Sequence, residues 1–188
     1  MSNTMSIKFS PLSKYDINYT NVIELYKEAF TTVRRVPSWL LRFILRKGKD
    51  GFSVLYENNN WIGLIYLTEY KDIVFVHFFA IAEVQRSSGY GSKVLDALKE
   101  KHENRVVLNI EELQAQQQNY SQRVKRKAFY LNNGFSSSGY LVKEPGERLE
   151  MLIHGGSISE EEIESIYKEL FGGILGSLYR PKIIAINE

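Results

Sequence analysis

A glycine-containing loop that follows an apolar run is the part of this sequence best suited to chemistry. The loop extends from Gln85 to Ser92, contains Gly89 and Gly91, and precedes a stretch with helical spacing of apolar residues. Backbone N–H groups at the start of a helix are unpaired and lie at the positive end of the helix dipole, which favours a phosphate. Glycine lets the backbone approach such an anion closely. The loop therefore predicts a pyrophosphate-binding turn, with a plain strand-to-helix turn as the alternative.

Two common nucleotide-binding motifs do not match this loop. A dinucleotide fingerprint requires a third glycine three residues after Gly91, where the sequence has Val94. A Walker loop requires Gly-Lys-Ser/Thr after a four-residue gap, which this loop does not contain. Binding of ATP or NAD is therefore the least favoured interpretation.

Two patterns in the sequence match the motifs of one known family. The loop contains Arg86-x-x-Gly89-x-Gly91, and the segment from Ala128 to Phe135 reads Ala-Phe-Tyr-Leu-Asn-Asn-Gly-Phe. The first pattern resembles the acetyl-CoA signature of the GNAT superfamily of N-acetyltransferases, Gln/Arg-x-x-Gly-x-Gly/Ala. The second is similar to the family's Phe-Tyr-x-x-x-Gly-Phe motif. Both occur in the family's order, and the resemblance covers residues 52–142.

The resemblance implies acetyl-CoA as co-substrate and no metal. Backbone amides of the loop would hold the CoA pyrophosphate. The backbone at the end of the preceding strand would pair with the pantetheine arm, and an N–H there would polarise the thioester carbonyl. The cofactor-binding residues that it implies are Ala80, Ile81, Arg86, Ser87, Ser88, Gly89, Tyr90, Gly91 and Ser92.

A further cofactor contact is expected on the basic helix before the second motif. The family often has an asparagine seven residues before the motif's tyrosine, and here Arg123 stands at that position before Tyr130. Two helical turns separate these residues, so both lie on one face, with Asn119 one turn further back. Both Arg123 and Asn119 remain candidates for contact with the cofactor.

The resemblance also implies the catalytic acid. The family's tyrosine at the position of Tyr130 commonly protonates the departing CoA thiolate, which requires a fixed place near the sulfur. The alternative is that the ring of Tyr130 only packs in the core.

The general base is not assigned by either motif. An amine acceptor is mostly protonated at neutral pH, so a group must remove a proton before attack. Glu111 and Glu112 end the strand after the loop's helix, and His77 lies on the strand that leads to Ala80. The alternatives are a solvated strand end for the glutamates and a hydrogen-bonded ring within the sheet for His77.

The basic helix could also suggest nucleic-acid binding. Arg123, Lys125, Arg126 and Lys127 are spread over more than one helical turn, so they cannot all face one way. A solvated helix face is the favoured interpretation, with a secondary role in attracting an anionic cofactor.

Composition narrows the classes of function. The 188 residues include no cysteine and three histidines far apart in the sequence, so Cys nucleophiles are excluded and a metal centre is not expected. The net charge of +2 gives no global basic field, and no apolar run approaches the ~20 residues of a membrane helix. We expect a soluble cytoplasmic protein that binds neither nucleic acid nor membrane.

The hydrophobic pattern predicts the elements that carry these residues. A helix is expected after Thr20 as N-cap, and a second from Pro37 to Gly48. Later helices are expected around Val94, Leu95 and Leu98, over 120–133 and over 159–170. Gly134 is expected to end the second of these, and a capping box at Ser159 is expected to begin the third. Strands are expected over 52–57, 61–70, 73–82, 105–110, 135–142 and 148–154.

The order of elements indicates an α/β layered domain. The GNAT resemblance implies a mixed, mostly antiparallel central sheet flanked by helices. We expect a single domain with N-terminal helices over 1–50, an acetyl-CoA-binding core over 51–143, and a variable hairpin, helix and tail over 144–188. The tail from Phe171 to Ile186 is apolar and must be covered by its own domain or by a second copy of the chain, as in a homodimer.

Together these observations predict an acetyl-CoA-dependent N-acetyltransferase. Transfer would be direct, to a primary amine of a small molecule or peptide, because the sequence has no cysteine to carry the acetyl group. The alternative is a non-catalytic acyl-CoA-binding or protein-interaction module on the same fold.

Overall fold

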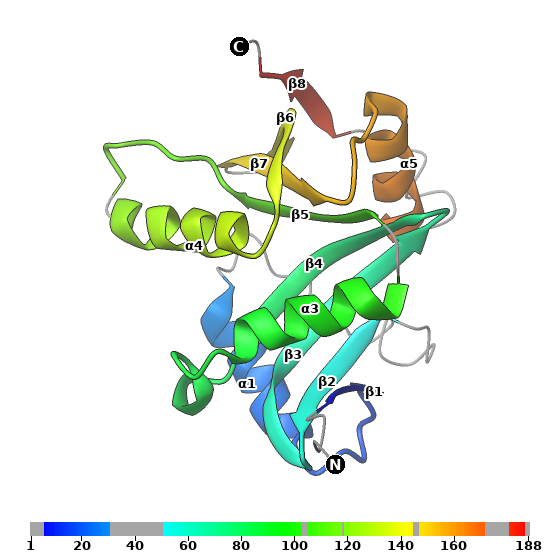
Figure 1. The fold of residues 1–188 in the computed structure, drawn as a ribbon, viewed down its shortest axis with the longest axis vertical. Helices are drawn as coiled ribbons and strands as arrows, with labels where there is room; N and C mark the ends of the chain where they lie inside the picture. The colour runs from blue at the N-terminus through cyan, green and yellow to red at the C-terminus, as the bar shows by residue number, and fades with distance from the viewer. Residues whose placement is uncertain are drawn as a thin grey trace. The chain divides into compact units, whose positions relative to one another are not determined.

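The computed structural model describes residues 6–30, 51–102, 105–117, 119–144, 147–171 and 181–186. The helix predicted from Pro37 to Gly48 lies outside the described residues. The elements, drawn in Figure 1, are β1 Ile7–Pro11, α1 Tyr19–Ala29, β2 Phe52–Glu57, β3 Asn60–Tyr70, β4 Ile73–Ile81, the 3₁₀ helix η1 Glu83–Gln85, α3 Tyr90–His102, β5 Arg105–Glu111, α4 Tyr120–Asn132, β6 Ser136–Glu144, β7 Glu147–His154, α5 Glu160–Phe171 and β8 Lys182–Ala185.

The described strands form one mixed sheet in the order β1-β2-β3-β4-β5-β7-β6-β8. The ladder between β4 and β5 is parallel, from Ile73 opposite Arg105 to Val76 opposite Leu108. The β1–β2, β2–β3, β5–β7, β6–β7 and β6–β8 ladders are antiparallel. The predicted fold class, a mostly antiparallel sheet flanked by helices, is confirmed.

The chain divides into two compact units, which are described separately. Unit 1 comprises Met1–Leu67 and His77–Lys101, and unit 2 comprises Thr68–Val76 and His102–Glu188. Strands β3 and β4 therefore contribute residues to both units.

Helix α1 packs its apolar face in unit 1. Val22, Leu25 and Tyr26 are buried, as the three- and four-residue spacing predicts. The helix begins at Tyr19 with Asn18 at the N-cap position, so the prediction of Thr20 as N-cap is wrong. Asn18 accepts the first helical bond, from the Val22 N–H at 2.8 Å, through its backbone carbonyl.

An aromatic cluster forms much of the interior of unit 1. The Tyr26 and Phe78 rings meet edge to face with centroids 5.0 Å apart, and Phe30 lies 4.8 Å from Phe78. Phe52 stacks on Tyr66 at 5.7 Å. Such pairs contribute about 0.5–1.5 kcal/mol each beyond the area that they bury. They hold α1 and the β2–β3 hairpin against the strand that leads to the glycine loop.

The core of unit 2 lies between α5 and the sheet. Ile163, Ile166 and Tyr167 of α5 are buried there, together with apolar residues of β4, β5, β6 and β7. The strand residues of this core are Ile73, Phe75, Val107, Val142, Met151 and Ile153. Ile183 of β8 packs against the same core, so this part of the C-terminal tail is a strand covered by its own chain.

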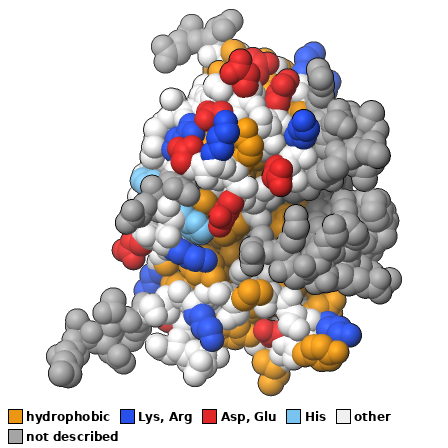
Figure 2. Space-filling model, turned by 90° about the vertical axis from the view of Figure 1, so that its right-hand side faces the viewer, with side chains coloured by type: hydrophobic (Ala, Val, Ile, Leu, Met, Phe, Trp, Pro, Cys, Tyr) orange, Lys and Arg blue, Asp and Glu red, His pale blue; other side chains and the backbone are white. Residues whose placement is uncertain are grey.

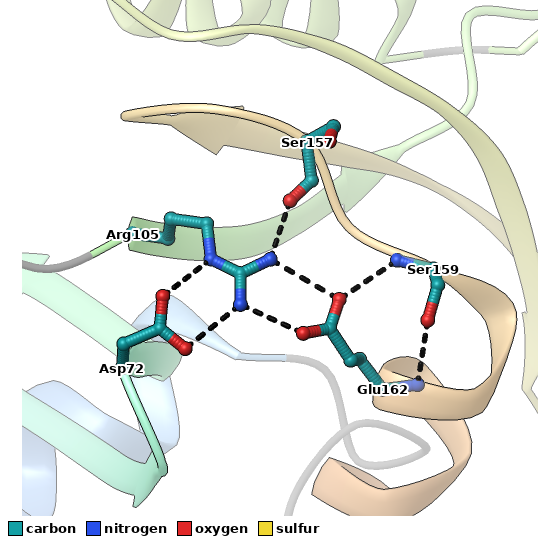
Figure 3. Close-up of polar contacts among 5 residues, drawn as sticks. All are labelled: Asp72, Arg105, Ser157, Ser159 and Glu162. Carbon is teal, nitrogen blue, oxygen red and sulfur yellow. Dashed lines mark hydrogen bonds and ion pairs between the residues drawn. The ribbon is translucent and has the colours of Figure 1, made fainter.

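A charged network ties the start of α5 to β5 (Figure 3). The Arg105 guanidinium contacts the Asp72 carboxylate at 2.8 Å and the Glu162 carboxylate at 2.7 Å. It also donates to the carbonyl of Ser157 at 2.5 Å. Hydrogen bonding to Arg105 lowers the pKa of both Asp72 and Glu162. The network fixes the turn before β4, the first residue of β5 and the first turn of α5 in one place.

The capping box predicted at Ser159 is confirmed. The Ser159 hydroxyl accepts from the Glu162 N–H at 3.2 Å, and the Ser159 N–H donates to the Glu162 carboxylate at 2.9 Å. Glu162 therefore takes part in both the capping box of α5 and the ion pair with Arg105.

Charged side chains of both signs are interspersed on the face shown in Figure 2. Hydrophobic side chains lie between them on the same face. This mixed surface accords with the small net charge of +2.

Candidate active site

The glycine loop of unit 1 has the geometry of an anion-binding turn. β4 ends at Ile81, η1 covers Glu83–Gln85, and α3 begins at Tyr90. Ser87 has φ 63° and Gly89 has φ 78°, both in the left-handed region. Such turns direct backbone N–H groups toward one point, and the first amides of α3 have no partner within the helix. Residues 86–89 are exposed, so an anion can reach these groups from solvent.

The side chain of Arg86 links this turn to the end of β4. Its Nε donates to the carbonyl oxygen of Ile81 at 3.1 Å, which joins the start of the turn to the end of β4. The Arg86 N–H donates to the Glu83 carbonyl at 3.1 Å. Arg86 therefore connects the two backbone segments predicted to contact the cofactor.

Gly63 lies against the predicted pantetheine-binding segment and was not singled out from the sequence. A Cβ at this position would lie 2.2 Å from the Ala80 carbonyl oxygen and 3.1 Å from the Ile81 Cα. Only glycine therefore lets the backbone of β4 approach β3 at the residues predicted to pair with pantetheine. The available signal was a glycine inside an apolar strand pattern, which often marks such a close approach.

A buried carboxylate supports the first turn of α3 and was also missed. Glu57 is only 5% exposed and lies 2.8 Å from the Lys93 Nζ. It also has a hydrogen bond with the Tyr90 side chain. The hydrogen bond with Lys93 lowers the pKa of Glu57, and the one with Glu57 raises the pKa of Tyr90. This Glu57 cluster, Glu57 with Tyr90 and Lys93, holds the helix end that presents the loop.

His77 lies in unit 1 as a partly buried ring next to Tyr66, with centroids 5.1 Å apart. Burial lowers the pKa of His77 to about 3. The ring is therefore neutral at physiological pH and is a weak acceptor for a proton from an ammonium group.

Tyr130 lies in unit 2 near the end of α4. Its side chain is buried, with ring centroids 5.2 Å from Phe129 and 5.7 Å from Phe135. Gly134, with φ 79°, ends the helix as predicted, and its carbonyl oxygen lies 2.8 Å from the His154 Nδ1. The position of Tyr130 is thus tightly constrained, which suits either an acid donor or a core residue.

The two glutamates at the end of β5 have cationic partners. Glu111 is buried and forms an ion pair with Arg126. Burial alone would lower the pKa of Arg126, but the hydrogen bond with Glu111 raises it overall. Glu112 contacts the Arg148 Nε and accepts from the Gln114 amide at 2.7 Å. A solvated strand end does not describe Glu111.

The basic helix α4 is only partly a solvated face. Arg126 pairs with Glu111, and Lys127 lies 2.6 Å from the carboxylate of Glu150, which is buried. Lys125 is exposed. Two of the four basic residues predicted to be solvated, Arg126 and Lys127, therefore fix α4 to the sheet.

Asn119 and Arg123 contact each other in unit 2. The Arg123 Nε donates to the Asn119 Oδ1 at 2.9 Å, and its terminal nitrogen donates to the Glu112 carbonyl at 3.0 Å. Asn119 occupies the N-cap position of α4. The two alternative cofactor contacts thus form one structural feature, and contact of either with the cofactor stays a prediction.

A groove of about 460 Å³ lies in unit 2 beside these residues. We call it the hairpin groove, because the end of the β6–β7 hairpin forms much of its wall. Its lining residues are Gln114, Gln117, Arg123, Lys143, Glu144, Glu147 and Arg148. Its volume falls within the range of small-molecule sites.

Two kinds of feature are absent from the part of the chain that the structure describes. There, no group of three or more His, Asp or Glu side chains could hold a metal ion. No helix among the described residues is long and apolar enough to cross a membrane.

Residues 19–135 match the model of the Acetyltransferase (GNAT) family. The chain belongs to the GNAT family. The resemblance stated from its two motifs is therefore confirmed, and the family uses acetyl-CoA. A comparison with curated proteins found no match.

Solved structures share this GNAT fold. A GNAT-family protein from Bacteroides thetaiotaomicron has a TM-score of 0.70 and 23% identity, covering 90% of this chain and 98% of that one. Ard1 from Thermoplasma volcanium has a TM-score of 0.57 and 19% identity, covering 79% and 97%. Arabidopsis thaliana Naa50, in complex with the bisubstrate analogue CoA-Ac-MVNAL, has a TM-score of 0.52 and 16% identity, covering 80% and 99%. At these identities the likeness shows the fold alone.

The structure groups the predicted site residues of this GNAT protein by unit. His77, Ala80, Ile81 and the loop residues 86–92 belong to unit 1. Glu111, Glu112, Asn119, Arg123 and Tyr130 belong to unit 2. Arg86 contacts Ile81 in unit 1, and Arg123 contacts Asn119 and Glu112 in unit 2. The roles of the individual residues stay predictions.

Proposed function

We propose that this GNAT protein is an acetyl-CoA-dependent N-acetyltransferase that transfers the acetyl group directly to a primary amine of a small molecule or peptide. The observation that carries the proposal is the exposed turn before α3, in which Ser87 and Gly89 both have left-handed backbones. Left-handed residues before a helix N-terminus favour the binding of an anion, which supports a role of this turn in holding the CoA pyrophosphate. Family membership supports acetyl transfer as the chemistry.

Residues of unit 1 would bind and orient the co-substrate. When bound, acetyl-CoA supplies the reactive thioester. Amides of residues 87–92 would hold the pyrophosphate, and the β4 backbone at Ala80 and Ile81, brought close to β3 by Gly63, would pair with the pantetheine arm. An N–H in that segment would stabilise negative charge on the carbonyl oxygen during attack.

Residues of unit 2 would donate and accept the protons of the reaction. When the amine nitrogen attacks the thioester carbonyl and the carbon–sulfur bond breaks, the Tyr130 hydroxyl would give a proton to the departing thiolate, and the proton that the nitrogen loses as the amide forms would restore Tyr130. Of the three base candidates, His77 is too weak a base, and Glu111 is buried in its pair with Arg126. Glu112, whose side chain is 20% exposed, is the accessible one, and we assign it the ammonium proton, directly or through water.

A CoA-release assay tests the proposal. The purified chain is mixed with acetyl-CoA and a panel of polyamines, aminoglycosides, amino acids and peptides with free N-termini. We expect amine-dependent release of free thiol and an acetylated product by mass spectrometry. Binding of acetyl-CoA without acetylation of any amine would instead support the non-catalytic acyl-CoA-binding module.

We further propose that the protein acts in the cytoplasm, because a transferase of this kind draws on the acetyl-CoA pool there. Detection of the tagged protein in the soluble cytoplasmic fraction is the expected result. Its recovery from a secreted or envelope fraction would contradict this location.

A further inference from the structure

The hairpin groove of unit 2 combines three segments that are far apart in the sequence. Gln114 and Gln117 come from the connection after β5, Arg123 from α4, and Lys143 and Arg148 from the β6–β7 hairpin. A small molecule of several atoms fits its volume of about 460 Å³.

Strand register separates the charges of the hairpin onto two faces. Lys143 lies opposite Arg148, and Glu144 lies opposite Glu147. Directly opposite residues share a face and neighbours along a strand alternate, so the two cations lie on one face and the two glutamates on the other.

Contacts with the helices identify these faces. Tyr167 of α5 donates to the Glu144 carboxylate at 2.8 Å, so the glutamates lie on the α5 face. Glu150 has the same strand parity as Arg148 and binds Lys127 of α4 at 2.6 Å. Lys143 and Arg148 therefore lie on the α4 face, the side from which Arg123 lines the groove.

The positive charges on this face are under-compensated. Lys143 has no ion-pair partner among the residues that the structure describes. The Arg123 side chain donates to neutral oxygens only, the Asn119 amide and the Glu112 carbonyl. Arg148 contacts Glu112 at 2.8 Å and is half exposed, with its side chain at 47%. Like charges directly opposite each other destabilise a sheet, and the contact with Glu112 offsets only the Arg148 side of the Lys143–Arg148 pair.

Hydrogen bonds hold the Glu112 carboxylate in place beside Arg148. Gln117 donates its amide to Gln114 at 3.0 Å, and Gln114 donates to Glu112 at 2.7 Å. Glu112 is thereby fixed beside Arg148, so it does not reach out to neutralise Lys143. The α4 face of the groove therefore keeps an excess of positive charge beside the Glu112 carboxylate, while Glu144 and Glu147 line the groove from the α5 face.

We propose that the hairpin groove binds a carboxylate carried by the acetyl acceptor, between Lys143 and Arg148. The inference rests on the proposed function, because it names the chemical class of the acceptor. Glu112, together with Glu144 and Glu147, which line the groove, disfavours a polyanion such as the phosphates of CoA. A zwitterion that offers an amine and a carboxylate matches this mixture of charges.

Direct binding tests the proposal without turnover. The full chain is saturated with CoA and titrated by calorimetry with N-acetyl amino acids and N-acetyl tripeptides, each as the free acid and as the carboxamide. We expect at least one acid to bind about tenfold more tightly than its amide, because a carboxylate gains charge-assisted hydrogen bonds that an amide lacks. The variant Lys143→Gln/Arg148→Gln should lose most of that preference and keep its affinity for CoA within about twofold.

Two further variants control for folding. Lys143→Gln alone removes an exposed side chain, so it should fold normally and still reduce the preference for acids. Lys168→Gln removes an exposed lysine of α5 that does not line the groove, and it should leave every affinity unchanged. Thermal unfolding of all variants confirms that the comparison is made between folded proteins.

The outcomes separate this inference from the proposed function. Equal affinity of acids and amides for the wild type overturns the carboxylate site. Loss of CoA affinity in the double variant, with the preference for acids intact, assigns the groove to a cofactor phosphate and also overturns it. If no amine is acetylated in the CoA-release assay, but the acid preference depends on Lys143, the transferase proposal fails and the carboxylate site stands.

Discussion

A single residue, Gly63, allows the β4 backbone at Ala80 to lie close to β3 in this GNAT protein. At Gly63 the Ala80 carbonyl oxygen occupies the space that a side chain would need, at 2.2 Å from an ideal Cβ. The obstacle is backbone, which cannot rotate away as a side chain does. The strand segment predicted to pair with pantetheine therefore depends on a residue 17 positions earlier that has no side chain.

Gly63→Ala should shift this segment of β4. We expect a loss of stability of about 1–3 kcal/mol, the usual cost of overpacking, and a raised KM for acetyl-CoA. Thermal unfolding and initial rates measure the two effects. Gly139→Asn is the matched control in a strand, because a Cβ there meets no atom and asparagine tolerates its φ of 82°. An unchanged KM in Gly63→Ala would contradict the role given to Gly63.

Tyr130→Phe removes only the hydroxyl group and so tests Tyr130 as the catalytic acid. The ring and its packing against Phe129 and Phe135 are retained, so stability should change little. Loss of the proton donor should lower kcat about 100-fold or more, with unchanged affinity for CoA. The deficit should shrink with an aryl thioester donor, because its thiolate leaves without protonation. An equal rate for variant and wild type would make Tyr130 a core residue only.

Helices and strands carry these residues, and most of their limits follow from local signals. The Ser159 capping box and Gly134 were predicted from residue type alone, because caps act over one helical turn. The start of α1 was misplaced at Thr20 because the side chain of Asn18 does not cap the helix. That side chain donates instead to the Tyr56 hydroxyl at 3.1 Å, a residue 38 positions away.

Contacts between distant elements were not predictable in the same way. Glu57 and Lys93 are 36 residues apart, and Glu112 and Arg148 meet only through the register of β5 and β7. Pairing of this kind depends on loop lengths and strand register, which the hydrophobic pattern does not specify. The loop motif was therefore visible in the sequence, whereas its support by Glu57 was not.

Glu57→Gln keeps a side chain of similar size but removes its charge. It should therefore weaken the hydrogen bonds that hold the first turn of α3. The affinity for CoA should fall several-fold, because Tyr90 and Lys93 lose a charged acceptor beside the loop. Calorimetry measures this effect, and Glu100→Gln, an exposed carboxylate on the same helix, is the control. Unaltered CoA affinity would show that the Glu57 cluster does not support the loop.

The contribution of Glu57 to stability should also depend on pH. Its folded pKa lies below the usual glutamate value, with the Lys93 hydrogen bond as the main cause. A carboxyl with a lowered folded pKa stabilises the protein above its unfolded pKa and loses this effect as the pH falls through the folded pKa. The difference in melting temperature between wild type and Glu57→Gln should thus be present at pH 7 and vanish in acid. A difference that persists undiminished below pH 3 would contradict this assignment.

At the scale of the whole chain, the predicted site residues fall into two units. The glycine loop belongs to unit 1, and the predicted acid, the glutamates and the hairpin groove belong to unit 2. Motif order alone predicted the family and the mostly antiparallel sheet, because both motifs stand at strand–helix junctions of that fold. The division into a core over 51–143 and flanking segments stays a prediction.

The C-terminal strand is the last element needed to close the core of unit 2. β8 pairs with β6 from Tyr140 opposite Ala185 to Lys143 opposite Lys182, and Ile183 packs against the core under α5.

Ile183→Ala should therefore lower stability by about 1–2 kcal/mol, less than for a fully buried isoleucine because Ile183 is partly exposed. Lys182→Ala, an exposed neighbour in the same strand, should leave the melting temperature unchanged. Because Lys143 of the hairpin groove lies in the ladder that β8 completes, Ile183→Ala should also weaken binding of the acidic ligands more than binding of CoA. Equal melting temperatures for Ile183→Ala and wild type would show that β8 is dispensable to unit 2.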